Sequence, residues 1–461
     1  MSFLELKRNI YDRLLDWKKS ANGSTALLIE GARRVGKSTL AEKFGREEYR
    51  TYALIDFAKA SPALKKSFEN DLNDLDRLYQ RISLECNVPL YPRESLVIFD
   101  EIQRFPKARE AIKYLVANGR YDFLETGSLI SIKEHVDDIV IPSEEEKIRM
   151  LPLTFEEFLT ASNQEIIRDH IRQCWHSRKS LDRDLHDRAS ALLREYILVG
   201  GMPQSVVAYL KNGKNFYEAD RQKRLILSLY QDDIKKAAKR YSSRVSAIFD
   251  NIPGFLSKHE KKVVLSDTGA GTVFAQFDDP LFWLGDSMMC SLCYRCTDPN
   301  VGFALNRDDS AVKCYMGDTG LLVSLAFSEN EISSVNLYKQ IMDGKLNLNE
   351  GMLHENVVAQ MLTAAGKKLY FYTHYSEQAH RNDIEIDFLL SNESRTHIKV
   401  CPIEVKSSKN YHAVSYDKFK ERFGRRIGAS LIVHPKQLVT EKDNLRIPTY
   451  MLPFVLEEGI V

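Results

Sequence analysis

The chain lacks long apolar runs and a large net charge. No stretch of its 461 residues approaches the roughly 18 consecutive apolar residues that a membrane-spanning helix needs. The segment from Met1 to Arg8 carries charged residues too early for a secretory signal. We therefore expect a cytoplasmic protein with no membrane contact. A net charge of +1 gives no overall signature of nucleic-acid binding, so any such binding must come from local patches.

Cysteine is scarce, and its seven positions are irregular. An odd number without regular spacing indicates reduced thiols and not a disulfide framework. Cys290, Cys293 and Cys296 repeat every third residue, with Cys314 further along, and such a run can ligate zinc or an iron–sulfur cluster. The segment also fits a buried helix or strand with small thiols packed inside it. We favour this second interpretation because the fourth cysteine is poorly spaced for a metal.

A phosphate-binding loop follows the apolar run Ala26 to Ile29. Residues 31–38 read Gly-Ala-Arg-Arg-Val-Gly-Lys-Ser, the complete G-x-x-x-x-G-K-[ST] pattern. The glycines let backbone N–H groups turn towards phosphates, Lys37 offsets phosphate charge, and the Ser38 hydroxyl can ligate Mg²⁺. A helix that opens at Thr39 adds the dipole of its N-terminus. We predict that ATP is bound by Gly31, Ala32, Arg33, Arg34, Val35, Gly36, Lys37, Ser38 and Thr39.

A second apolar run, Leu96 to Phe99, ends in the acidic pair Asp100 and Glu101. Four apolar residues before a carboxylate are typical of the Walker B strand of P-loop proteins. Asp100 is then expected to hold Mg²⁺ through water, and Glu101 to orient and deprotonate the attacking water. The doubled acid favours ATP hydrolysis over binding alone. We therefore assign catalytic roles to Lys37 and Glu101, and metal-binding roles to Ser38 and Asp100.

Two further strands complete the predicted nucleotide site. A short apolar strand at residues 52–56 lies between the two motifs along the chain, and a strand from Tyr121 ends in Thr126, Gly127 and Ser128. Thr126 or Ser128 is expected beside the γ-phosphate, where a hydroxyl senses hydrolysis. An additional strand, a catalytic glutamate and a polar sensor describe the branch of P-loop ATPases that includes the AAA type. Right-handed crossovers then predict a doubly wound parallel α/β sheet.

This ATP-binding domain is predicted to span residues 1–165. Thr154 and Glu157 form a capping-box pattern that fixes a helix near its end. Residues 166–305 read as a helical and winged-helix-like region, interrupted by a turn at residues 200–203. The basic turn at residues 258–262 would supply phosphate contacts if that region binds nucleic acid.

Residues 306–461 contain a second group of chemically suggestive residues. Glu355 is expected on a helix, Asp387 on a strand, and Glu404 with Lys406 on one face of the next strand. Nucleases of the restriction-endonuclease fold use this pattern: the two carboxylates, here Asp387 and Glu404, hold Mg²⁺, and the lysine stabilises developing charge. Glu355, Asp387, Glu404 and Lys406 are therefore candidate catalytic residues. A cross-strand charge cluster on a solvated sheet is the competing interpretation.

The chain resembles the prokaryotic AAA-type ATPases that carry a C-terminal domain of unknown function with restriction-endonuclease-like character. The resemblance covers nearly the whole chain. It rests on the segments 31–39, 100–103, 126–128, 151–158, 200–203 and 318–322, together with Glu355, Asp387 and residues 404–406. It implies ATP binding by the first domain, a winged-helix-like middle and a nuclease-like end. One departure is the acidic segment 143–150, where the family often has Gly-Arg, so that the identity of a phosphate-contacting arginine stays open.

The leading hypothesis is an ATP-hydrolysing molecular switch that couples nucleotide state to a C-terminal domain that binds DNA or a protein partner. A Mg²⁺-dependent, ATP-regulated DNA nuclease is one alternative. A signalling regulator that binds only protein is the other. Assembly into a homo-oligomer is compatible with each of these hypotheses.

Overall fold

The computed structural model describes residues 5–127, 142–238, 241–258, 261–263, 278–300, 302–328, 338, 340–342, 350–378, 380–393, 398–441 and 444–459. The chain divides into two compact units. The first comprises Lys7–Leu151 with Asp286–Met288, and the second comprises Met1–Leu6, Pro152–Gly285 and Met289–Val461. The three-part division at residues 165 and 305 stays a prediction.

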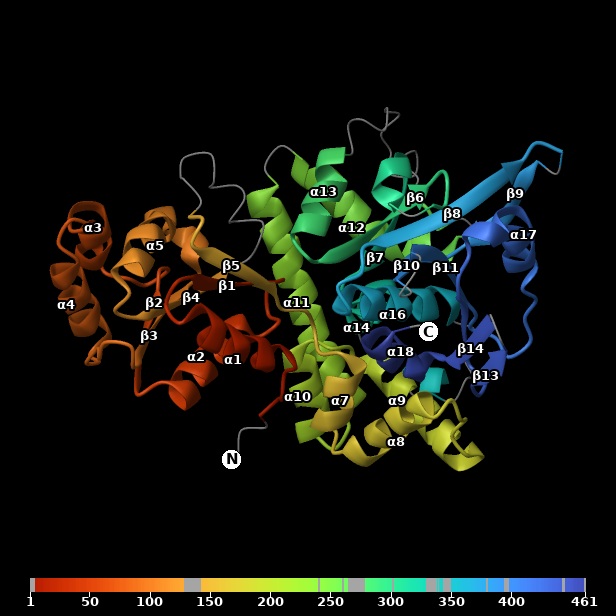
Figure 1. The fold of residues 1–461 in the computed structure, drawn as a ribbon, viewed down its shortest axis with the longest axis horizontal. Helices are drawn as coiled ribbons and strands as arrows, with labels where there is room; N and C mark the ends of the chain where they lie inside the picture. Colours follow the sequence, from red (N-terminus) through yellow and green to blue (C-terminus); the bar gives the residue numbers. More distant parts are fainter. Residues whose placement is uncertain are drawn as a thin grey trace. The chain divides into compact units, whose positions relative to one another are not determined.

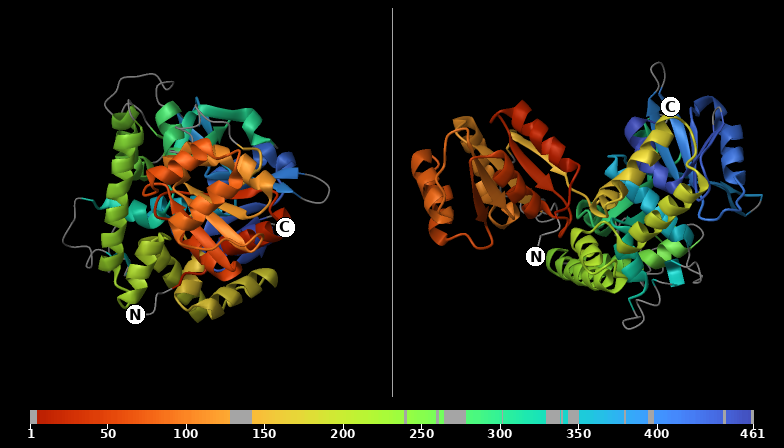
Figure 2. Two further views of the ribbon diagram at one scale, coloured as in Figure 1. Left: turned by 90° about the vertical axis from the view of Figure 1, so that its left-hand side faces the viewer. Right: turned by 90° about the horizontal axis from the view of Figure 1, so that it is seen from below.

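The first unit is a parallel sheet with helices on both faces (Figures 1 and 2). Its helices are α1 (Ile10–Ala21), α2 (Lys37–Glu48), α3 (Pro62–Asn70), α4 (Leu75–Cys86), η1 (Ile102–Arg104) and α5 (Pro106–Asn118). Its strands are β1 (Ala26–Glu30), β2 (Thr51–Asp56), β3 (Ser95–Asp100), β4 (Asp122–Gly127) and β5 (Glu145–Arg149). They run in the order β2-β3-β4-β1-β5, and every neighbouring pair is parallel. The predicted parallel α/β fold is confirmed.

The strand order brings the nucleotide motifs to the same end of the sheet, at the carboxyl ends of β1, β3 and β4. Along the chain β2 separates β1 from β3, but in the sheet β4 lies between them and β2 is at the edge. Apolar residues of α3, α4 and α5 form one core with Leu28, Val97 and Phe123. Gly45 of α2 packs against Ile98, which points to the opposite face from Val97. Because helices cover both faces, β1 and β3 are apolar along most of their length.

The second unit begins with helices and ends in two sheets (Figure 1). Its helices are α7 (Phe155–Ala161), α8 (Glu165–His176), α9 (Arg183–Val199), α10 (Pro203–Lys211), α11 (Phe216–Ala237), α12 (Ser242–Ser257), α13 (Asp278–Asp286), η5 (Phe303–Asn306), α14 (Thr319–Ala326), α16 (Glu350–Ala364), α17 (Val414–Phe423), η6 (Gly424–Arg426), η7 (Thr449–Met451) and α18 (Leu452–Glu458). Its strands are β6 (Cys290–Cys296), β7 (Arg307–Met316), β8 (Leu369–Ser376), β9 (Arg381–Ile386), β10 (Phe388–Glu393), β11 (Ile398–Val405), β12 (Ser430–His434), β13 (Val439–Glu441) and β14 (Asn444–Pro448). The predicted helical middle and C-terminal α/β region are therefore both present.

The sheets of this unit have the strand orders β7-β6-β8-β9 and β10-β11-β12-β14-β13. Helix α16 packs on β6, β7 and β8 of the first sheet and on β11 of the second. Most of its side chains are buried, including the polar Glu355, Asn356 and Gln360, as expected for a helix that packs on two sheets. Residues on α16 are consequently positioned to contact both sheets.

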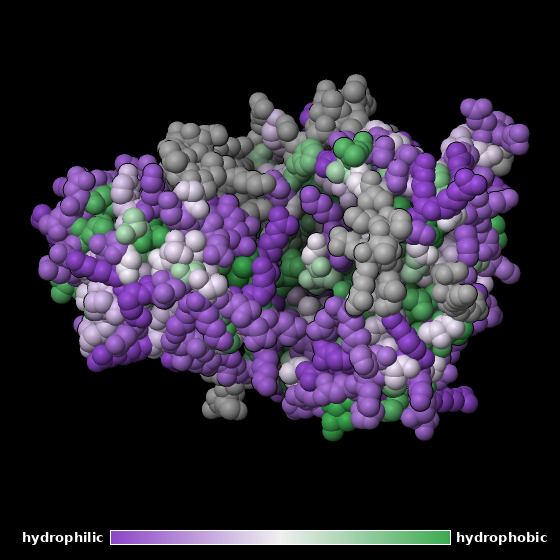
Figure 3. Space-filling view, in the orientation of Figure 1, coloured by the Kyte–Doolittle hydropathy of each residue, from purple (hydrophilic) through white to green (hydrophobic). Residues whose placement is uncertain are grey.

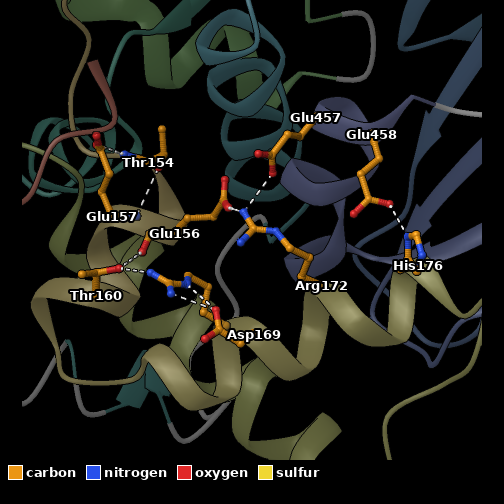
Figure 4. A network of polar contacts seen from close by, with 10 residues as sticks. Thr154, Glu156, Glu157, Thr160, Asp169, Arg172, His176, Glu457 and Glu458 are labelled. Atoms are coloured by element: carbon orange, nitrogen blue, oxygen red, sulfur yellow. Dashed lines mark hydrogen bonds and ion pairs between the residues drawn. The ribbon is translucent and has the colours of Figure 1, made fainter. Parts of the chain in front are cut away.

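The capping box predicted at residues 154–157 is present at the start of α7 (Figure 4). The Thr154 side chain accepts a hydrogen bond from the Glu157 backbone, and the Glu157 carboxylate accepts one from the Thr154 N–H. Arg172 of α8 then joins α7 to α18, because its guanidinium lies 3.0 Å from Glu156 and 2.9 Å from Glu457. This network fixes the segment that enters the second unit.

The cysteines are free thiols, and Cys290, Cys293 and Cys296 are buried in β6. Successive strand positions alternate between faces, so Cys290 and Cys293 point to opposite sides of the sheet. Within the described ranges, no group of three or more His, Cys, Asp or Glu side chains is arranged to hold a metal ion. The thiols therefore pack as small apolar groups.

The described helices include none with the length and apolar character needed to cross a bilayer. The face drawn in Figure 3 is mainly hydrophilic, and apolar residues are scattered among polar ones over its coloured part. Single exposed apolar side chains of this kind are ordinary on protein surfaces.

Candidate functional site

The phosphate-binding loop connects β1 to α2 and is held from within by its own lysine. Gly36 adopts a left-handed backbone with φ of 100°, a conformation that favours glycine. Lys37 is buried, and its Nζ donates to the carbonyl oxygens of Gly31 and Ala32, at 3.0 Å each. Burial lowers the pKa of Lys37 to about 8, against the opposing effect of the nearby Glu101 and Asp100 carboxylates. Among the other predicted ATP contacts, Ala32 and Val35 are buried, Arg33 and Ser38 are partly buried, and Arg34 and Thr39 are exposed.

Two hydroxyl groups, from Ser38 and Thr126, meet at one carboxylate oxygen of Asp100. The Ser38 hydroxyl donates to Asp100 Oδ1 at 2.6 Å, and the Thr126 hydroxyl donates to the same oxygen. These residues come from α2, β3 and β4, which the sheet order brings to one edge. A carboxylate beside a hydroxyl suits Mg²⁺, which prefers a few protein oxygens and completes its shell with water and phosphate oxygens. Ser128, the other predicted sensor, lies outside the described residues.

Glu101 is held at the same edge by Gln103, a residue to which the sequence motifs give no role. Its backbone adopts a left-handed conformation with φ of 55°, uncommon for a residue other than glycine. Gln103 Nε2 donates to Glu101 Oε2 at 2.6 Å. The Gln103 side chain is buried, and its Oε1 atom has no hydrogen-bond partner. The only signal for Gln103 in the sequence was its presence in the segment 100–103.

Two further residues, Met150 and Arg8, hold the loop in place through backbone carbonyl groups. No local sequence pattern predicts these contacts. The Met150 N–H donates to the Glu30 carbonyl at 2.7 Å, and a Cβ atom on Gly31 would lie 2.4 Å from the Met150 oxygen. Gly31 is therefore required by this close approach of two backbones. Arg8 donates to the carbonyl oxygens of Val35, at 3.0 Å, and Leu151, at 2.5 Å.

In the second unit, Glu355 on α16 is surrounded by cations and one hydroxyl. Lys313 Nζ lies 3.1 Å from Glu355 Oε1, Tyr315 donates to the same oxygen, and Lys261 pairs with Oε2. Burial acts to raise the pKa of Glu355, but Lys313 and Lys261 outweigh it and lower the pKa to about 2. Lys313 belongs to no predicted motif, and Lys261 lies in the basic turn predicted to contact phosphate; the two lie 42 and 94 positions from Glu355.

Asp387 and Glu404 lie on adjacent chain segments, as expected for an antiparallel pair. Phe388 of β10 pairs with Ile403 of β11. Asp387 Oδ2 accepts a hydrogen bond from the Val405 N–H at 2.8 Å. Lys406 Nζ lies 3.0 Å from Glu404 Oε1.

Burial raises the pKa of Asp387 to about 6 and that of Glu404 to about 7. Lys313 also lies 3.8 Å from Asp387 Oδ1, so the predicted Glu355 and Asp387 share one buried cation. Glu404 and Lys406 flank Val405, whose N–H donates to Asp387, so they adjoin the same group. The predicted residues are therefore gathered into one cluster.

Three protein families match parts of the chain. An AAA domain family matches residues 23–159. Two domains of unknown function, DUF8612 and DUF4143, match residues 190–331 and 350–452. No curated protein matches the sequence. Since the C-terminal match carries no activity, the restriction-endonuclease-like character of that region is not shown.

Three solved structures show a distant likeness to the chain. C. elegans PCH-2 shares 15% identity at a TM-score of 0.27, over 48% of this chain and 70% of that one. The Pyrococcus horikoshii signal-transduction ATPase PH0952, with a tetratricopeptide repeat sensor, shares 10% identity at a TM-score of 0.28, over 78% and 50% of the two chains. Aeropyrum pernix ORC1, solved in complex with DNA, shares 11% identity at a TM-score of 0.27, over 71% and 94%.

Likenesses at these TM-scores carry no argument about this chain. The family match stands on sequence, and it coincides with the parallel sheet, the phosphate-binding loop and the acidic pair at the end of β3. Residues 23–159 are therefore similar to an AAA domain family, and they carry the phosphate-binding loop and parallel sheet that are typical of P-loop proteins.

Proposed function

We propose that the first unit hydrolyses ATP in the presence of Mg²⁺ and acts as a switch for the C-terminal domain. The observation that carries the proposal is the meeting of Ser38 and Thr126 at Asp100 Oδ1, beside Glu101. A metal-binding pair, a sensor hydroxyl and a base are then available at one sheet edge, next to the buried Lys37.

Each side chain has a separate task in this proposal. Lys37 exchanges the carbonyl oxygens of its own loop for phosphate oxygens and neutralises their charge. Ser38 and Asp100 would hold Mg²⁺, which supplies further neutralisation of the phosphates. Glu101 accepts a proton from the attacking water, and Gln103 keeps its carboxylate oriented towards that water. Thr126 links the position of Asp100 to β4.

Coupling to the second unit is supported by contacts that begin at Leu153. Met150 is tied to Glu30 and Gly31 of the phosphate-binding loop within the first unit. Leu153 follows three residues later, and its N–H donates to the Gly201 carbonyl at 2.7 Å. The Tyr196 hydroxyl donates to the Leu153 carbonyl at 2.7 Å. A conformational change in the phosphate-binding loop that moved Met150 would therefore also move Leu153, at the start of the second unit, because only residues 151 and 152 separate them.

Gly201, which accepts the hydrogen bond from Leu153, also binds Asp318, a buried carboxylate. The Gly201 N–H donates to Asp318 Oδ2 at 2.5 Å, and the other oxygen caps α14 through the Leu321 N–H. The junction is too tight for side chains, because a Cβ atom on Gly201 would lie 2.2 Å from the Leu153 oxygen. A Cβ atom on Gly320 would lie 2.5 Å from Gly200. Three segments that carry the family resemblance meet here.

The last step reaches α16. Gln360 Oε1 accepts hydrogen bonds from the Thr319 N–H and hydroxyl, at 2.9 and 2.8 Å. Gln360 Nε2 donates to Tyr196, which closes the path back to Leu153. Asn356, next to Glu355, accepts from the Met316 N–H at 2.9 Å. The polar face of α16 is thus connected to the segment that leaves the ATPase domain, and this supports regulation of the C-terminal cluster by nucleotide.

The proposal is tested by ATP turnover of the wild type, Lys37→Ala and Glu101→Gln, each with and without duplex DNA. Turnover that both substitutions abolish is expected. Stimulation by DNA would identify a nucleic-acid target, whereas equal rates would favour a protein partner. Undiminished turnover in both variants would contradict the assignment of the site.

A further inference from the structure

Lys313 is a fully buried ammonium surrounded by carboxylates from α16, from β9 and from the residue between β9 and β10. It projects from β7, and its Nζ lies 3.1 Å from Glu355, 3.6 Å from Glu385 and 3.8 Å from Asp387. The exposed fraction of the Lys313 side chain is 0%. A buried charge of this kind is stable only when it is paired and hydrogen-bonded. The carboxylates and Lys313 therefore depend on one another.

The same contacts occupy most of the oxygens that a metal would need. Glu355 accepts from Lys313 and Tyr315 on Oε1 and from Lys261 on Oε2. Asp387 accepts from the Val405 N–H on Oδ2 and faces Lys313 with Oδ1. Of the six carboxylate oxygens on Glu355, Asp387 and Glu404, five have a partner, and Glu404 Oε2 alone is buried without one.

One free oxygen does not make a site for a divalent cation. Mg²⁺ requires near-octahedral oxygen coordination, usually with direct carboxylate ligands. An incoming cation would also lie beside two or three ammonium groups, which repel it in a low-dielectric interior. Among the residues whose positions are described, no group of three or more His, Cys, Asp or Glu side chains is arranged to hold a metal. The residues present do not fit the metal that the Asp and Glu-x-Lys pattern predicts.

We propose that Lys313 is the resident cation of this cluster, so that Asp387 and Glu404 bind no divalent metal and the domain does not cleave nucleic acid by metal-dependent hydrolysis. The cluster instead fixes α16 between the two sheets, because Glu355 of α16 pairs with Lys313 of β7, which also faces Asp387 after β9. This inference does not rest on ATP hydrolysis, because every contact that carries it lies in the second unit.

The test uses Mn²⁺ as the probe and the full chain without nucleotide, with free Mn²⁺ measured by electron paramagnetic resonance. Asp100→Asn identifies any binding at the ATPase site. We expect Asp387→Asn to bind as much Mn²⁺ as the wild type. Loss of a Mn²⁺ site in Asp387→Asn, or Mn²⁺-dependent nicking of plasmid DNA that Asp387→Asn abolishes, would overturn the proposal.

A second variant tests the proposal by a gain of metal binding. Lys313→Met removes the internal cation at similar length and is expected to gain a Mn²⁺ site that a further Asp387→Asn substitution removes. Lys399→Met, at an exposed position on β11, is the matched control and should gain none. A folded Lys313→Met that gains no site would count against the proposal. If circular dichroism shows that this variant does not fold, the comparison of wild type with Asp387→Asn decides. ATP turnover in the same preparations keeps this outcome separate from that of the ATPase site.

Discussion

Replacing Glu404 with glutamine should stabilise the protein at pH 8 and have little effect at pH 5. Burial raises the pKa of Glu404 from 4.5 to about 7, even though Lys406 opposes the shift. An acid whose pKa is raised by folding contributes stability below its unfolded pKa and loses it as the pH rises through the folded pKa. The loss therefore occurs between about pH 4.5 and pH 7. Glutamine keeps the shape and cannot ionise.

The magnitude follows from the shift. A change of about 2.5 pKa units corresponds to about 3 kcal/mol at pH 8, where Glu404 is ionised in both states. At pH 5 the folded carboxyl is protonated, and the cost falls below about 1 kcal/mol. The exposed fraction of Glu404 is 4%, so solvent screening does not reduce this figure much.

Urea denaturation of the wild type and Glu404→Gln at both pH values measures the difference in the free energy of unfolding. Glu421→Gln, at an exposed position on α17, is the control and should be neutral at both. The reasoning would be refuted if Glu404→Gln were destabilising at pH 8, or if its effect were the same at pH 5 and pH 8.

Two further substitutions test the ATPase site and the junction. Gln103→Ala removes a hydrogen bond to a charged group, which is worth about 1.5–3 kcal/mol. It should therefore lower kcat for ATP hydrolysis roughly 10- to 100-fold and leave KM unchanged. Steady-state kinetics that showed only a rise in KM would contradict this expectation. Gly201→Ala should cost about 1–3 kcal/mol in a thermal or urea unfolding assay, because its Cβ atom would lie 2.2 Å from the Leu153 oxygen. Gly424→Ala, which would meet nothing within 4 Å, is its control, and equal stability of the two variants would count against the tight junction.

Local chemistry made the ATPase motifs predictable from sequence. The loop at residues 31–38, the acidic pair at the end of β3 and the capping box at Thr154 each depend on neighbours in the chain, so their residue types and spacing are enough. The position of β4 between β1 and β3 could not be predicted from local residue types and spacing. It depends on how strands separated by long connections pair, and no local pattern encodes that pairing.

The pairing of Lys313 and Lys261 with Glu355 was not predictable for the same reason. Glu355, Asp387, Glu404 and Lys406 were selected because they fit a known pattern, whereas Lys313 sits in an ordinary strand and meets Glu355 only in the folded chain. The contact between Gly201 and Asp318 joins residues 117 positions apart, so its two segments could be noticed but not connected. The role of a buried charged residue depends on its ion-pair partners. When those partners are distant in the sequence, only the folded structure shows which they are.

Hydrogen exchange of α16 in Glu101→Gln, with and without ATP, tests the proposed switch most directly. This variant should bind ATP and fail to hydrolyse it, and so hold the nucleotide-bound state. The account predicts that ATP changes the exchange rates of amides in α16, through Leu153, Gly201 and Thr319. Saturating ATP that alters exchange around the phosphate-binding loop and leaves α16 unchanged would contradict it.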